Sequence, residues 1–244
     1  MASQPSDADA LTLWFNPPDD ERGRRHVLTR ERVIAEALAV IAADGAQSLS
    51  MRALAGRLGV VPGALYRHIR GKDQLHDLIL DAVLAEVDCR ADPALPWTAQ
   101  VAALAHRLRT VLENHPGIAA LLKTRDPLSP TSLTLAEAFL APLLAAGLPG
   151  REAALAFRLI YDYTLGFALA DPTSPAEQRL RDSATRERLN AFLRSLPASR
   201  FPALAAHGTD AWAGDRDQRF SSGLDTLLRG LQADQRPPGA SPGS

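Results

Sequence analysis

The sequence predicts an all-α protein, in which a three-helix N-terminal domain is joined by a long helix to a larger helical body. Apolar residues recur at intervals of three and four along most of the chain, and Pro or Gly residues separate these runs. Between Leu49 and Leu75 two such runs are short and close together, which is typical of a helix-turn-helix. The 244 residues are enough for such a domain and a helical body behind it.

The first expected helix opens at Thr29 and closes at Asp44-Gly45. Thr29 is a suitable N-cap, although Arg32 stands where a capping box has Glu or Gln. The apolar positions of this helix are Val33, Ile34, Ala37, Leu38 and Ile41.

Two short helices follow around a turn at Gly59, where a left-handed backbone can end a helix. Ser48 or Ser50 can cap the first of them. Pro62 suits the start of the second, because its missing N–H would have no partner in a first turn. The residues expected to be buried are Ala53, Leu54 and Leu58 in the first helix and Leu65 and Ile69 in the second.

The remaining side chains of this motif are left to face a groove of double-stranded DNA. The residues that we expect to contact DNA are Ser50, Arg52, Val61, Pro62, Gly63, Ala64, Tyr66, Arg67, His68 and Lys72.

Their roles differ in chemistry. Arg52 is the preferred base reader, since a guanidinium can bind a guanine edge with two hydrogen bonds. Arg67 can contact either base or backbone, and His68 can pack, touch phosphate or do both. Tyr66 is interpreted as a phosphate contact rather than a core aromatic, and Lys72 as a phosphate contact rather than a plain surface charge.

Residues 27–88 resemble the DNA-binding domain of the tetracycline-repressor (TetR) family. The resemblance rests on the order of several features, among them the run LGV-x-x-x-x-LYRH-x-x-x-KD-x-L. It implies a DNA-binding transcriptional regulator, with a palindromic operator as its partner.

Charge and composition agree with this interpretation. Residues 22–73 hold ten Arg or Lys against four Asp or Glu, whereas the whole chain has a net charge of −1. The basic charge therefore gathers in the N-terminal domain. Basic residues Arg22, Arg24, Arg25 and His26 either form a solubilising arm or enter the minor groove. The single cysteine, Cys89, excludes an internal disulfide and fits a reducing cytoplasm, and we expect no leader and no membrane partner.

A long helix is expected from Lys72 to Asp88, followed by a linker at residues 92–96. Four further helices are expected between Pro- and Gly-containing stops, over residues 97–114, 118–123, 132–146 and 151–170. Residues 173–188 are polar and indicate a mobile segment or a solvated helix start. The last apolar pattern contains Phe220, Leu224 and Leu228, before a Pro/Gly/Ser tail that should be disordered.

The body is similar to the C-terminal domain of the tetracycline repressor itself, through residues 163–169, Thr124-Arg125 and Gly147-Leu148. The resemblance implies a homodimer formed by two helices of each body, with Leu155, Leu159, Leu224 and Leu228 at the interface. It also implies a pocket for a small-molecule effector. The residues that would line it are Asp88, Leu104, Leu108, Leu112, Thr124, Arg125, Phe139, Phe157 and Tyr161.

Most of these pocket residues are apolar, so we expect a largely apolar effector. The tetracycline repressor holds magnesium through a His before its Leu-Gly-Thr-Arg-Pro run, whereas residues 120–125 here contain none. We therefore expect neither a metal nor a cofactor.

The favoured function is a homodimeric repressor released from DNA by such an effector. The alternative is a DNA-binding regulator whose body binds a protein partner. An enzyme is the weakest hypothesis, because no nucleophile–base pair, phosphate loop or metal cluster stands out. The expected domains are an arm (1–26), a DNA-binding domain (27–88), an effector and dimerisation domain (89–232) and a tail (233–244).

Overall fold

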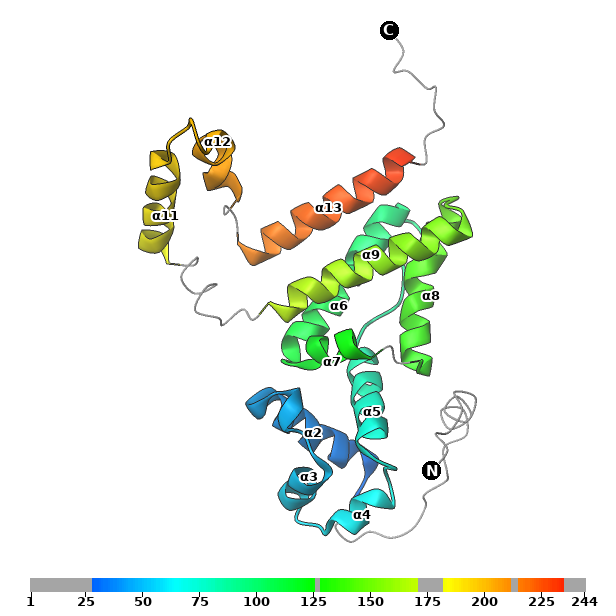
Figure 1. Ribbon diagram of the computed structural model, residues 1–244. Coiled ribbons are helices and arrows are strands. Elements are labelled where there is room, and N and C mark those ends of the chain that lie inside the picture. The colour runs from blue at the N-terminus through cyan, green and yellow to red at the C-terminus, as the bar shows by residue number, and fades with distance from the viewer. Residues whose placement is uncertain (1–27, 126–127, 171–181, 212–214, 235–244) are drawn as a thin grey trace, which may run out of the picture. The chain divides into compact units, whose positions relative to one another are not determined.

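The computed structural model describes residues 28–125, 128–170, 182–211 and 215–234, all of which form helices or the turns between them (Figure 1). The predicted all-α fold is thereby confirmed. The chain divides into two compact units, residues 1–169 and 170–244. The arm predicted over residues 1–26 lies outside the described residues, as does nearly all of the tail.

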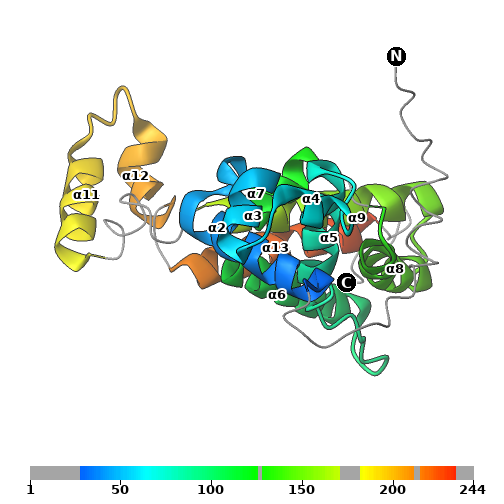
Figure 2. The same cartoon turned by 90° about the horizontal axis from the view of Figure 1, so that it is seen from below.

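The N-terminal domain contains five helical elements in chain order. They are α2 (Arg30–Asp44), the short 3-10 turn η1 (Ala46–Ser48), α3 (Met51–Leu58), α4 (Pro62–Tyr66) and α5 (Lys72–Leu84). Seen from below, α2, α3 and α4 cluster near the start of α5 (Figure 2). We call α2, η1, α3 and α4 the head.

The predicted helix signals act locally as expected. The Thr29 hydroxyl accepts a hydrogen bond from the Arg32 backbone N–H, and the Ser50 hydroxyl accepts one from Ala53. Gly59 has φ 69° and ψ 30°, so α3 ends in the left-handed conformation that glycine adopts without strain. The predicted burial of Ala53 in α3 was wrong. Ala53 is exposed and Ala55 is buried, because Leu54, Ala55 and Leu58 share the inner face of the helix.

Helix α5 is shorter than the predicted span from Lys72 to Asp88, since it ends at Leu84. The backbone tightens there into hydrogen bonds from Glu86 N to Val83 O and from Val87 N to Leu84 O. Asp88 then accepts a hydrogen bond from the backbone N–H of Arg90, two residues on, which competes with continuing the helix.

Four helices form the body within the first unit, close to the predicted ranges. They are α6 (Trp97–Asn114), α7 (Ile118–Thr124), α8 (Pro130–Ala145) and α9 (Gly150–Leu169). Helix α9 packs on both α6 and α8. Its buried Ile160 belongs to a core that also holds Leu104, Leu108 and Phe139, so the apolar stripes of these helices cover one another.

The second unit contains α11 (Ser183–Ser195), α12 (Pro202–Ala211) and α13 (Arg216–Asp234). Helix α11 begins inside residues 173–188, for which the sequence indicates a mobile segment or a solvated helix start, and α12 was not predicted. The two pack closely, since a Cβ at Gly208 would lie 3.3 Å from Leu193 Cδ2. No helix in the described ranges is long and apolar enough to cross a lipid bilayer.

Helix α7 touches the N-terminal domain at both of its ends. At its start, Gly117 has φ 88°, and a Cβ on it would lie 2.8 Å from Ile41 Cγ2 of α2. At its end, the Arg125 guanidinium lies 2.9 Å from Asp73 Oδ1 and 3.5 Å from Asp77 Oδ1 of α5. The body is therefore fastened to the head and to the helix that follows it.

Arg125 also faces His76, which is buried on α5. Arg125 Nη1 donates to His76 Nδ1 over 3.1 Å, so Nδ1 carries no proton, and the buried Nε2 has no hydrogen-bond partner among the described residues. Burial, helped by the charges of Arg125 and Lys72, lowers the pKa of His76, whereas Asp73 opposes the shift. Burial raises the pKa of the neighbouring Asp77 carboxyl.

This arrangement predicts that the free energy of unfolding falls as the pH drops below about 6.5, the ordinary pKa of histidine. In that range the unfolded chain takes up a proton that folded His76 does not hold. The loss is complete below the lowered pKa of the folded state. Asp77 acts with the opposite sign above its ordinary pKa of 3.8, since the folded state holds that proton longer.

Urea unfolding at pH 7.5, 6.5 and 5.5 measures how steeply the free energy of unfolding changes with pH. His76→Gln should flatten this slope, whereas His207→Gln, at an exposed position, should leave it unchanged. Equal slopes for wild type and His76→Gln would contradict the assignment.

Candidate functional site

The ten residues predicted to contact DNA lie on α3, α4, the start of α5 and the turns between them. Most are exposed, and the exposed fractions of Val61 and Tyr66 reach 70% and 54%. Ala64 and His68 are half-buried. Large apolar and aromatic side chains that the fold leaves uncovered indicate a contact surface.

The cations of this surface are available for phosphates. Arg52, Arg67 and Lys72 form no ion pair with any residue that the structure describes. Arg57, by contrast, pairs with Glu36 and so ties α3 to α2. The three unpaired charges lie on α3, at the end of α4 and at the start of α5, and α4 is a helix of a width that fits the major groove.

The turn between α3 and α4 fixes their relative direction. Val60 N donates to Ala55 O over 3.0 Å, and Leu65 is fully buried beneath α4. The opposite side of α4 therefore points outward. This is the geometry in which a second helix enters a groove while the first crosses the backbone.

The predicted effector residues fall into two groups. The first group forms an apolar cluster on α6, α8 and α9. Phe157 lies between Phe139 and Tyr161, with ring centroids 5.8 Å apart in each pair. Phe139 is buried, Phe157 and Tyr161 are half-buried, and three further members, Leu104, Leu108 and Leu112, are buried on α6.

The second group consists of polar residues that are engaged in contacts of their own. Thr124 donates its hydroxyl to Leu121 O, and Arg125 is engaged with α5. Asp88 binds Arg90 through both carboxylate oxygens, which holds its pKa well below the usual range. The Arg107 guanidinium binds the backbone oxygens of Asp88 and Arg90 as well.

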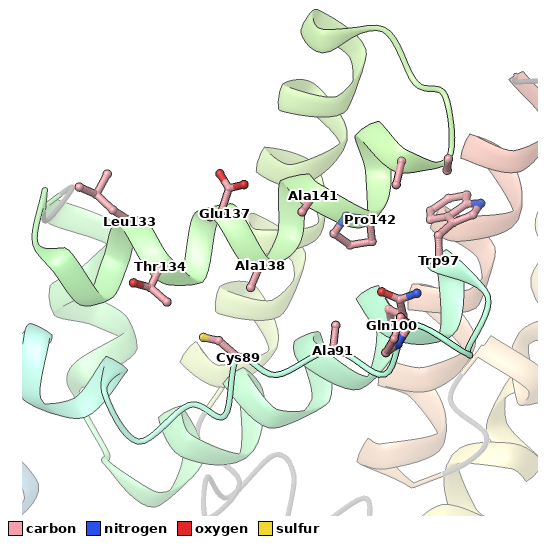
Figure 3. A pocket seen from close by; sticks show the side chains of 13 residues that line it. Cys89, Ala91, Trp97, Gln100, Leu133, Thr134, Glu137, Ala138, Ala141 and Pro142 are labelled. Carbon is pink, nitrogen blue, oxygen red and sulfur yellow. The ribbon is translucent and has the colours of Figure 1, made fainter.

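A groove of about 1040 Å³ runs between residues 89–100 and one face of α8 (Figure 3). None of the nine predicted effector residues lines it. Sequence reasoning missed this groove, because its two walls are more than thirty residues apart in the chain. The one local signal was the run of small residues Ala138, Ala141 and Ala145 along one side of a helix.

The predicted dimer residues also separate. Leu155 and Leu159 are 61% and 47% exposed on α9, four residues apart and so on one face. Leu224 and Leu228, on α13 of the second unit, are 1% and 4% exposed. Among the described residues, no three His, Cys, Asp or Glu side chains gather in a way that could hold a metal ion.

Comparison with known proteins matches both parts of the chain. Residues 33–78 fit the family described as bacterial regulatory proteins, tetR family, and residues 91–235 fit the tetracyclin repressor-like C-terminal domain. An HTH-type transcriptional regulator of Saccharopolyspora erythraea is 34% identical over 91% of this chain and 91% of its own. The HTH-type transcriptional repressor DrrR1 of Streptomyces coeruleorubidus is 31% identical over 90% of this chain and 83% of its own.

A solved structure gives the same result. ActR of Streptomyces coelicolor, in complex with actinorhodin, is 31% identical and superposes with a TM-score of 0.74, over 86% of this chain and 100% of its own. The exposed helix-turn-helix surface, the two family matches and the full-length relatives agree: the chain belongs to the tetR family of DNA-binding transcriptional regulators.

Proposed function

We propose that this regulator is a homodimeric repressor that a small, largely apolar effector releases from a pseudo-palindromic operator. The family consists of transcriptional regulators and not of enzymes. The observation that carries the proposal is the bond from Arg125, at the end of α7, to Asp73 in the first turn of α5. It joins the body to a helix that begins with Lys72 at the DNA-binding surface. We assign DNA binding to residues 27–88 and effector binding and dimerisation to residues 89–232.

The effector site that we propose is the cluster of Phe139, Phe157 and Tyr161 on α8 and α9. Phe157 and Tyr161 are half-buried, so their rings offer an apolar ligand contact area beside the buried Phe139. The similar ActR binds actinorhodin, which supports a small-molecule effector here as well.

Release follows from the packing between this cluster and α7. Helix α9 contacts α7, and α7 in turn holds α2 through Gly117 and α5 through Arg125. A ligand that prefers a shifted α9–α7 arrangement therefore moves Lys72 and the head out of register with DNA. A coupling of about 1–3 kcal/mol lowers operator affinity roughly 5- to 150-fold, and DNA lowers ligand affinity by the same factor.

The dimer that we propose uses the exposed stripe of Leu155 and Leu159 on α9. An apolar stripe on a long helix is stabilised when it packs on its copy in a partner. A two-fold dimer then holds two heads roughly 34–36 Å apart, which is one turn of DNA.

The first prediction concerns the roles of two cations on DNA. Arg52→Ala should cost about 1–3 kcal/mol and relax sequence preference, since it removes a base contact. Lys72→Ala should weaken binding to operator and to random DNA alike. It should also reduce the slope of the logarithm of the binding constant against the logarithm of salt concentration by about one. Lys123→Ala, an exposed lysine of α7, is the matched control. Fluorescence anisotropy over a salt series measures both, and wild-type behaviour of both head variants would refute the roles.

The second prediction concerns the dimer. Leu155→Glu should give a monomer at micromolar concentration, because a charge then replaces one of the two leucines of the stripe. Leu144→Glu, at a 49% exposed position of α8, should remain dimeric. Light scattering distinguishes the two species, and a Leu155→Glu dimer would place the interface elsewhere.

The third prediction concerns release. Phe157→Ala should weaken the response to an apolar ligand and leave ligand-free operator binding unchanged, because it removes a ring of the proposed effector site and no DNA contact. Phe192→Ala, on α11 and 60% exposed, is the control. Phe139→Ala is a poorer probe, since its ring is fully buried and its loss costs about 3–5 kcal/mol of stability.

The measurement combines melting temperature and operator affinity for a panel of apolar aromatic compounds that begins with actinorhodin. A compound that raises the melting temperature through Phe157 but leaves operator affinity unaltered would contradict ligand release. That result would favour the alternative in which the body binds a protein partner.

A further inference from the structure

The groove between residues 89–100 and α8 has a chemical character of its own, distinct from the aromatic cluster of the proposed effector site. Its walls are mostly apolar and small, with Ala138, Ala141 and Pro142 on α8. Trp97, at the first residue of α6, stands at one end, and Cys89 lies across from Thr134 (Figure 3). At about 1040 Å³ the groove exceeds the size of usual small-molecule pockets.

The polar groups of the groove are mainly acceptors. Glu137 is the single charged residue in its lining and forms no ion pair with the described part of the chain. Pro142 has no N–H, so the Ala138 carbonyl lacks the donor that a helix normally supplies four residues on. Gln100 uses its Nε2 on Leu95 O, and Thr134 donates its hydroxyl to Pro130 O, which leaves further acceptor capacity.

Trp97 adds an aromatic wall. Its indole makes no ring or cation contact with another described residue and is half-buried at the groove end. An indole face attracts both flat aromatic rings and cations. A ligand that meets all of these groups is flat, apolar and carries a positive charge with N–H donors.

We propose that this groove is a second binding site, and that it takes a planar aromatic cation. The ring system lies along Trp97 and the alanines of α8, and the cationic amine binds the Glu137 carboxylate. Anions of the same shape are rejected, because the groove offers no positive charge to pair with them. The site does not depend on the proposed effector cluster, with which it shares no lining residue.

Cys89 makes the site measurable. It is the single cysteine of the chain, it lies in the groove lining, and burial raises the pKa of its thiol. Alkylation by iodoacetamide at pH 8.5, followed by mass spectrometry on the full-length protein without DNA, reports whether the groove is occupied.

The probes are 9-aminoacridine, a planar cation, and acridine-9-carboxylate, an anion on the same three-ring frame. We expect 9-aminoacridine to slow alkylation of Cys89 in a saturable manner, and the carboxylate to have little effect at equal concentration. Glu137→Gln should weaken 9-aminoacridine about tenfold, which is the loss of a charge-assisted hydrogen bond. Trp97→Leu should weaken it too.

Two controls separate this site from the rest of the molecule. Glu152→Gln, an exposed glutamate in the first turn of α9, should keep wild-type protection. The Phe157→Ala variant should keep wild-type protection of Cys89 as well. A result against the proposed effector site can therefore be distinguished from a result against the groove site. The proposal is overturned if 9-aminoacridine does not protect Cys89 from alkylation. It is also overturned if 9-aminoacridine protects Cys89 equally well in the Glu137→Gln and Glu152→Gln variants.

Discussion

Helix α5 packs against both the head and the body, and the rest of the structure depends on this double packing. It packs on α2 of the head and on α6, α7 and α8 of the body. Leu75, Leu78, Ile79, Leu80 and Val83 are therefore all buried, although they point in different directions around the helix. Because one rigid element belongs to both hydrophobic cores, the head cannot take a new position without disturbing the body.

The polar contacts around α5 are less favourable than its apolar ones. His76 is buried beside a guanidinium with one nitrogen unpartnered, and Asp77 is half-buried with a raised pKa. Unsatisfied or repelled groups reduce the stability of the arrangement that holds them. Such a junction between α5 and α7 opens at less cost than an all-apolar one, which is compatible with the proposed release from DNA.

The sequence was most informative where the determinants are local. The helix-turn-helix could be predicted nearly residue by residue, because Ser50, Gly59 and Pro62 each act through the backbone next to them. Helix α6 was predicted over the range 97–114 that the structure shows, since its apolar spacing is unbroken and Pro96 and Pro116 flank it. The predicted end of α5 was wrong, because the apolar pattern continues past Leu84, where hydrogen bonds from Glu86 N to Val83 O and from Val87 N to Leu84 O close the helix.

Non-local features could not be predicted in this way. Helices α11 and α12 have one buried leucine, Leu193, between them among the described side chains, so they lack the apolar stripe by which a helix is recognised. The groove required knowing that residues 89–100 lie along α8. The ion pairs of Arg125 joined positions about fifty residues apart. In each case the contact partner, and not the local pattern, determined the feature.

The close approach of Gly117 to Ile41 has a mechanical consequence. The head is attached to the body covalently through α5 and by packing at the turn before α7. A body held at two separate points keeps one easy motion, a rotation about the line through both points, whereas tilting in any other direction must break one attachment. In a two-fold dimer that single axis is repeated by symmetry, so both heads would turn through the same angle and the distance between them would be the coordinate that changes.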